Sequence, residues 1–142
     1  MMPICSIRIV VKKLSYLPLP NVDDKSLGTE LKRRRLTLGW TQERCAEYFE
    51  VRKDSYQNWQ WNGIIPSLNT RKPVNKFLNL NFWDDESNSL ANRVSLYRIN
   101  HGLKQSELAK LIRVSPSTIH RIEKESNSVS KNLMKFVNEF IQ

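Results

Sequence analysis

The feature that most constrains the fold of this chain is an internal repeat. Identical residues recur 63 positions apart, at Arg35 and Arg98, Gly39 and Gly102, Gln42 and Gln105, Ala46 and Ala109, and Val51 and Val114. Apolar residues recur at the same spacing, so that Phe49 corresponds to Ile112. Such self-similarity indicates two copies of one structural unit. The sequence therefore predicts two similar domains in tandem.

Near the end of each copy the spacing between matching residues is expected to change. Residues 74–79, Val-Asn-Lys-Phe-Leu-Asn, are most similar to residues 133–138, Leu-Met-Lys-Phe-Val-Asn, which is an offset of 59. This predicts that the late loop of the first copy is four residues longer than that of the second.

Charge and composition give the expected boundaries. We expect an N-terminal arm at residues 1–25, a first domain at 26–80, an acidic linker at 81–89 and a second domain at 90–142. Residues 26–83 hold ten basic and five acidic side chains and residues 87–142 hold nine and four, so each copy carries a charge of +5. The arm could be a strand that pairs chains, a basic arm for a minor groove, or in part a wrongly assigned start. The sequence does not choose among these.

Composition narrows the classes of function. With 23 Lys and Arg against 14 Asp and Glu, the chain has a net charge of +9. A chain this basic is expected to bind a polyanion, and nucleic acid is the first candidate. No apolar run approaches the length of a membrane span, and we expect a cytoplasmic protein. The few cysteines and histidines lack any usual zinc spacing, and the four glycines form no phosphate-binding loop. We therefore expect no metal, no cofactor and no enzymatic activity.

Within each copy the apolar spacing is that of helices, so the predicted fold is all-α. In the first copy the pattern predicts three helices. The first starts near residue 27 and stops at Gly39, the second is capped by Thr41, and the third covers residues 53–61. The second copy repeats this pattern, with Ser115 capping its third helix and Pro116 at the first turn. A last helix over residues 131–141 is expected to be capped by Ser130.

Two segments carry a family resemblance. Residues 39–60, Gly-Trp-Thr-Gln-Glu-Arg-Cys-Ala-Glu-Tyr-Phe-Glu-Val-Arg-Lys-Asp-Ser-Tyr-Gln-Asn-Trp-Gln, resemble the helix-turn-helix of the Cro and lambda-repressor-like family. Residues 102–123 resemble it too, with a Gln that opens the second helix, an Ala four residues later and a Val that closes the turn. The small Ala lets the two helices cross closely. The resemblance implies two tandem lambda-repressor-like domains that bind double-stranded DNA as a transcriptional regulator.

The resemblance also implies which residues meet DNA. The second helix of this fold crosses the phosphate backbone and the third enters the major groove, so Gln42 and Gln105 are expected at phosphates. The groove-facing positions are expected to be Arg52, Lys53, Asp54, Gln57 and Asn58 in the first copy, and Ser115, Ser117, His120 and Arg121 in the second. Asn58 and Gln57 suit adenine, and Arg121 suits guanine.

The copies also differ in ways that leave alternatives open. Arg98 and Glu123 match a pair that usually forms a salt bridge in this family, whereas Arg35 faces Gln60, which predicts either a looser first domain or an Arg35 free to meet phosphate. The first copy is rich in aromatic residues, most of them expected in the core, with Trp61 as a candidate for stacking on bases. An antitoxin-like or accessory role, in which one domain binds a protein partner, is the alternative function, and a homodimer is also open.

Overall fold

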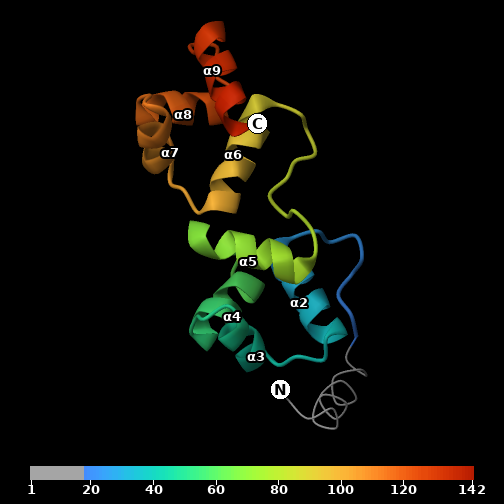
Figure 1. Ribbon diagram of the computed structural model, residues 1–142. Coiled ribbons are helices and arrows are strands. Elements are labelled where there is room, and N and C mark those ends of the chain that lie inside the picture. Colours follow the sequence, from blue (N-terminus) through green and yellow to red (C-terminus); the bar gives the residue numbers. More distant parts are fainter. Residues whose placement is uncertain (1–17) are drawn as a thin grey trace. The chain divides into compact units, whose positions relative to one another are not determined.

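The computed structural model describes residues 18–142, and in this range the chain is helical and contains no strand (Figure 1). Eight helices follow one another along it: α2 (Leu27–Thr37), α3 (Gln42–Tyr48), α4 (Lys53–Trp61), α5 (Leu68–Leu78), α6 (Leu90–His101), α7 (Gln105–Ile112), α8 (Pro116–Glu123) and α9 (Lys131–Ile141). The all-α prediction is therefore confirmed for the described residues. Most of the expected arm, residues 1–17, lies outside them.

The described helices group into two compact units. The first unit holds the residues as far as Pro66 together with Pro73–Leu80, and the second holds Ser67–Lys72 together with Asn81–Gln142. Part of the expected acidic linker is held on α6 of the second unit. The Asn92 side chain donates to a carboxylate oxygen of Asp84 (2.8 Å) and to the Ser87 carbonyl (2.9 Å), and it accepts from the Asp85 N–H (3.4 Å).

The core of the first unit is built around the ring of Phe49, at the turn between α3 and α4. Its centroid lies 5.7 Å from that of Trp59 and 5.2 Å from that of Phe77, both in edge-on arrangements that aromatic rings favour. Tyr56 and Trp59 supply the inward stripe of α4, as the spacing predicted. Other buried apolar residues of this unit are Leu31, Leu36, Cys45, Ala46, Pro66, Val74 and Leu78.

The core of the second unit is aliphatic. Ile119 and Ile122 form the inward stripe of α8 and are 0% and 4% exposed. They pack with buried side chains of the other three helices and of the loop before α9: Val94, Leu108, Ala109, Ile112, Val129 and Val137. The inward positions predicted for α8 are therefore confirmed.

Side-chain caps mark where the helices begin. Thr41 accepts the Arg44 N–H (3.1 Å) and Ser115 accepts the Thr118 N–H (3.3 Å), as predicted. Ser130 likewise caps α9 by accepting the Leu133 N–H. At the N-terminus of α7, the Glu107 carboxylate accepts the Lys104 N–H instead (2.7 Å). These bonds satisfy backbone donors that the first turn of a helix leaves without partners.

The prediction of a longer late loop in the first copy is wrong. α5 begins at Leu68 and α9 at Lys131, the same 63 positions apart as the starts of the three preceding helices, and the loops before them span residues 62–67 and 124–130. Val74 and Val137, also 63 apart, are both fully buried. The misleading offset of 59 differs from 63 by about one helical turn, so both registers present the same apolar face.

In the first unit, α2 and α4 approach each other very closely at Gly28. A Cβ atom built on Gly28 would lie 2.2 Å from the Gln60 carbonyl oxygen, a backbone atom that no side-chain rotation can move away. The matching residue of the second unit is Ala91. The helices of the first unit therefore pack at a distance that only glycine permits.

We predict that Gly28→Ala destabilises the first unit by about 1–3 kcal/mol or more, the usual cost of an overpacked site. The change is measured by denaturant unfolding, with Lys32→Ala, an exposed position of the same helix, as the control. A Gly28→Ala variant as stable as the Lys32→Ala variant would contradict the close packing of α2 on α4.

Candidate nucleic-acid interface

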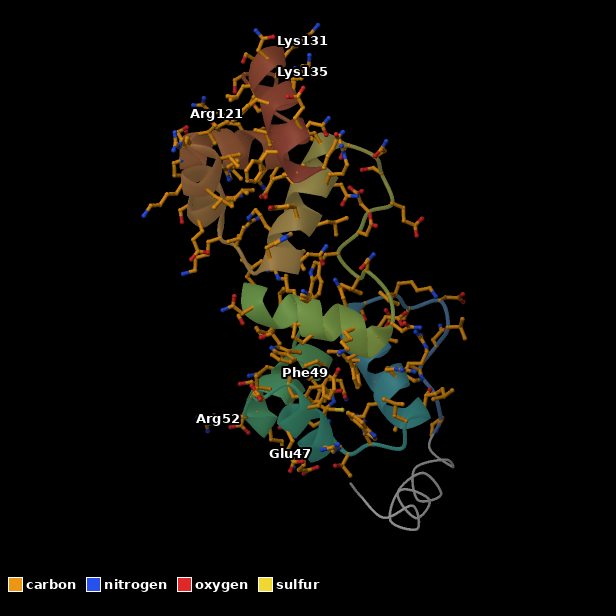
Figure 2. All side chains as sticks on the ribbon, in the orientation of Figure 1. Glu47, Phe49, Arg52, Arg121, Lys131 and Lys135 are labelled. Atoms are coloured by element: carbon orange, nitrogen blue, oxygen red, sulfur yellow. The ribbon has the colours of Figure 1, made fainter. Side chains whose placement is uncertain are left out.

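Helix α8 is anchored by one face and leaves the other open. Because Ile119 and Ile122 are buried, the remaining positions Ser117, His120 and Arg121 are exposed. Figure 2 shows Arg121 pointing away from the body of the second unit. Three of the four groove-facing positions predicted here are therefore exposed, although the Ser117 hydroxyl is hydrogen-bonded to that of Ser115 (2.9 Å). The fourth, Ser115, is exposed too, but its hydroxyl is engaged in capping α8.

A polar network ties three helices of the second unit together. Arg98 on α6 makes the predicted salt bridge with Glu123 on α8 (2.7 Å), and both side chains are only about 15% exposed. The second carboxylate oxygen of Glu123 accepts from the side-chain amide of Gln105 (2.5 Å). The first residue of α7 is therefore held in a set orientation, with one amide hydrogen left for another acceptor. The phosphate role of Gln105 remains a prediction.

The first unit builds the equivalent junction without a carboxylate. Arg35 donates to the Gln60 side-chain oxygen (3.2 Å) and to the Trp40 carbonyl (3.1 Å), and it is only 8% exposed. The alternative in which Arg35 is free to meet phosphate is therefore wrong, because burial between two acceptors holds its guanidinium inside the unit. Gln42 accepts from the Gln57 amide (2.9 Å), so these two predicted DNA-binding residues contact each other.

The basic side chains predicted to bind DNA in the first unit are paired with neighbouring acids. Lys53 lies 2.5 Å from Glu43, and Arg52 lies 3.3 Å from Asp54. The hydrogen bond from Lys53 lowers the pKa of the Glu43 carboxyl, which keeps this acid ionised beside the amine. Asn58 is exposed but accepts from the Asn62 side chain (2.7 Å). These contacts occupy much of the face that the resemblance assigns to the groove.

Residues 41–61 and the matching residues 104–124 carry opposite net charge. Residues 41–61 hold three basic and four acidic side chains, a sum of −1, whereas residues 104–124 hold five basic and two acidic ones, a sum of +3. At two matching positions the sign is reversed, with Glu47 against Lys110 and Glu50 against Arg113. Glu50 and Arg113 occupy matching turns of the two units and have similar backbone conformations, with φ of 55° and 61°. The helix positions of the two segments correspond, whereas their charges do not.

Sequence reasoning missed three basic residues around α8. Lys110, Arg113 and Lys124 are exposed, and the described residues include no ion pair to any of them. Lys110 lies on α7, Arg113 directly after α7 and Lys124 directly after α8, and their positive charge would attract a phosphate backbone. Comparing the two copies position by position, rather than by total charge, would have identified them.

The expectation that most aromatic residues of the first copy belong to the core is met only in part, because Trp40 is half-buried and Tyr48 is 38% exposed. Tyr56 and Trp59 are buried, while Trp61 at the end of α4 is 61% exposed. Ile64 and Ile65, in the loop that follows, are 53% and 60% exposed. Trp61 is therefore accessible to a base or to a protein side chain.

The described residues contain no obvious catalytic group. Burial raises the pKa of the Cys45 thiol to about 11, so this cysteine is a poor nucleophile at neutral pH. The His101 ring stacks on that of Tyr97 (4.1 Å between centroids), and its Nδ1 lies 2.8 Å from the Tyr97 carbonyl oxygen. No cluster of His, Cys, Asp and Glu suited to a metal occurs in residues 18–142, and no helix there has the length and apolar character needed to cross a bilayer.

We predict that Glu123→Gln destabilises the second unit by about 1–3 kcal/mol, because Arg98 then remains partly buried without its counter-charge. The matched change Gln60→Glu offers Arg35 a carboxylate and is expected to leave the first unit as stable or more so. Hydrogen exchange of backbone amides measures each unit separately. Unchanged protection of α8 in Glu123→Gln would contradict the role given to this network.

Comparison with known proteins gives one match. A family model described as helix-turn-helix matches residues 94–141, which include α7, α8, α9 and most of α6. No curated protein and no solved structure matches the chain. The match does not extend to the first unit, whose likeness to this family stays a prediction. Residues 94–141 form a helix-turn-helix domain of the Cro and lambda-repressor-like type.

Proposed function

We propose that this chain is a sequence-specific regulator of transcription that binds duplex DNA through its second unit, with α8 in the major groove. The observation that carries the proposal is the exposed face of α8, with Ser117, His120 and Arg121, on a domain whose family match suggests DNA binding. We propose in addition that the protein acts in the cytoplasm, where a regulator can reach DNA.

In this arrangement each group has a separate task. Arg121 donates two hydrogen bonds to a guanine edge, and Ser117 and His120 contact neighbouring bases. Gln105 and the free backbone N–H groups at the start of α7 bind a phosphate, which positions the domain without reading sequence. Lys110, Arg113 and Lys124 add salt-sensitive attraction.

We further propose that the first unit is a second copy of the same domain. The helix starts at Leu27, Gln42, Lys53 and Leu68 each recur 63 residues later, and the inward residues of α4 and α8 correspond. Two such domains on one face of DNA would bind sites about 10 base pairs apart. Because α4 and α8 differ in sequence, the two half-sites would differ as well. The negative segment 41–61 and its internal ion pairs make the contribution of the first unit the smaller one.

The same charge difference favours one alternative function for the first unit, the binding of a protein partner. The charges of residues 41–61 sum to −1, Trp61 at the end of this segment is exposed, and so are Ile64 and Ile65 just after it. An acidic surface with exposed apolar residues suits a protein better than a phosphate backbone. The second unit would then direct the chain to DNA, and the first would recruit the partner.

We predict that Arg121→Ala weakens binding to a preferred duplex by about 1–3 kcal/mol and removes the preference at one base pair. Asn58→Ala, the matching change in the first unit, is expected to cost less. Both effects are measured by fluorescence anisotropy on the preferred duplex and on single-base variants of it. An equal loss on every duplex from Arg121→Ala would contradict base reading by this residue.

We also predict that Glu47→Lys combined with Glu50→Arg raises DNA affinity, because it gives the first unit the charges of the second. The log–log dependence of affinity on salt should steepen by about one to two. Asp23→Lys with Glu86→Arg makes the same change in net charge at other exposed positions and serves as the control. If both double variants gain equally, or neither gains, the first unit does not lie against the duplex, and the protein-partner alternative is favoured.

A further inference from the structure

The second unit contains a cavity to which the proposed DNA contacts give no role. Its volume is about 690 Å³, within the roughly 300–1,000 Å³ that is typical of small-molecule sites, and it is open to solvent. Residues of α6, α7 and α8 and of the segment before α6 form its wall. All of them belong to the second unit.

The cavity lies where the matching helices of the first unit are in contact. In the first unit a Cβ atom on Gly28 would lie 2.2 Å from the Gln60 carbonyl oxygen, so the close approach of α2 to α4 requires glycine. The matching residue of the second unit is Ala91, which lines the cavity. Its methyl group prevents α6 from approaching α8 as closely. The second unit therefore has space at a junction that the first unit closes.

The polar side chains at this junction also differ between the units. In the first unit Gln57 donates to Gln42 (2.9 Å). The matching residues of the second unit, His120 and Gln105, both line the cavity, and Gln105 donates to Glu123 instead. The hydrogen bond between α3 and α4 is thus replaced by two side chains on the wall of a cavity.

The wall of the cavity is acidic although the unit as a whole is basic. Three carboxylates line it, those of Asp85, Glu123 and Glu125, together with the amine of Lys124. Glu123 is already paired with Arg98. Asp85 and Glu125 therefore supply the negative charge that a ligand can meet, and this charge favours a cation. The residues that match the three acids in the first unit are all uncharged: Val22, Gln60 and Asn62.

An aromatic ring completes the wall. Trp83 is half-buried and lines the cavity. Its ring is held by the ring of Phe82 (5.3 Å between centroids) and by the Arg71 guanidinium, which lies 5.4 Å from the ring centroid. Indole rings attract cations and also offer apolar surface. A tryptophan beside free carboxylates suits a ligand that has both a positive charge and an apolar part.

We propose that this cavity binds a small organic cation, such as an amine or amidine, and that the bound cation strengthens DNA binding by the second unit. The charge of the ligand meets Asp85 and Glu125, and its apolar part contacts Trp83. The effect on DNA rests on the proposed function, in which Gln105 and His120 meet the duplex. A cation beside them offsets carboxylates that repel phosphate. The coupling is reciprocal, so DNA raises the affinity for the cation by the same factor.

Titration of the full chain without DNA tests the site by itself. Benzamidine is the probe, because it joins an amidinium group to an aromatic ring, and the controls are its uncharged analogue benzamide and its anionic analogue benzoate. Two-dimensional NMR should show saturable shifts of the Trp83 indole signal and of backbone amides around the cavity, with a Kd below about 1 mM. The controls should bind at least about tenfold more weakly. No saturable shift with benzamidine, or equal shifts with all three compounds, would overturn the proposal.

Substitutions locate the bound cation. Asp85→Asn combined with Glu125→Gln should weaken benzamidine binding at least about tenfold. Glu47→Gln with Glu50→Gln makes the same change in net charge at exposed positions of the first unit and should leave the binding unchanged. Ala91→Leu should abolish binding by filling the cavity, with circular dichroism to check the helices. Equal losses from the two double variants, or full binding by a folded Ala91→Leu variant, would place the cation elsewhere and overturn the site.

A titration with DNA tests the regulatory part separately. On a preferred duplex, saturating benzamidine should raise the affinity of the chain about fivefold or more, whereas benzamide should not. The variant with Asp85→Asn and Glu125→Gln should lose this response. If benzamidine binds but leaves DNA affinity unchanged, the regulatory part is overturned. If benzamidine binds and no duplex does, the proposed DNA binding fails while the cavity site stands.

Discussion

The structure of each unit depends on one constraint, the burial of two inward residues on a helix of only eight or nine residues. α8 is too short to be stable alone, and Ile119 and Ile122 supply its attachment to α6 and α7. Each fully buried isoleucine contributes about 1.5–3 kcal/mol. Because these two positions are fixed inward, Ser117, His120 and Arg121 must face outward, and the candidate interface follows from the core.

The same framework carries two different surfaces. In the second unit a carboxylate closes the junction between α6 and α8, and α7 and the ends of α7 and α8 carry exposed basic residues without ion pairs among the described residues. In the first unit a neutral Gln60 takes the place of that carboxylate, and Lys53 and Arg52 are held by acids nearby. Corresponding helix positions therefore do not imply the same function, because function here depends on surface charges that the core does not constrain.

Much of the fold could be predicted from the sequence, since caps and inward stripes are local signals. Thr41, Ser115 and Ser130 were correctly identified as caps, and Ile119 and Ile122 as core. The register of α5 against α9 was not, because a shift of one helical turn preserves the apolar pattern. The candidate site was less predictable. The bond between Gln42 and Gln57 and the burial of Arg35 depend on the distance between helices, and spacing along the chain does not report that distance.

The central claim is that α8 reads the sequence of duplex DNA. Selection of bound duplexes from a random pool at moderate salt, followed by sequencing, tests it most directly. We expect an enriched motif with one dominant half-site and a weaker, different half-site about one helical turn of DNA away. That motif should disappear when Ser117, His120 and Arg121 are all replaced by alanine. No enrichment over the starting pool, or the same motif from the substituted chain, would contradict the claim.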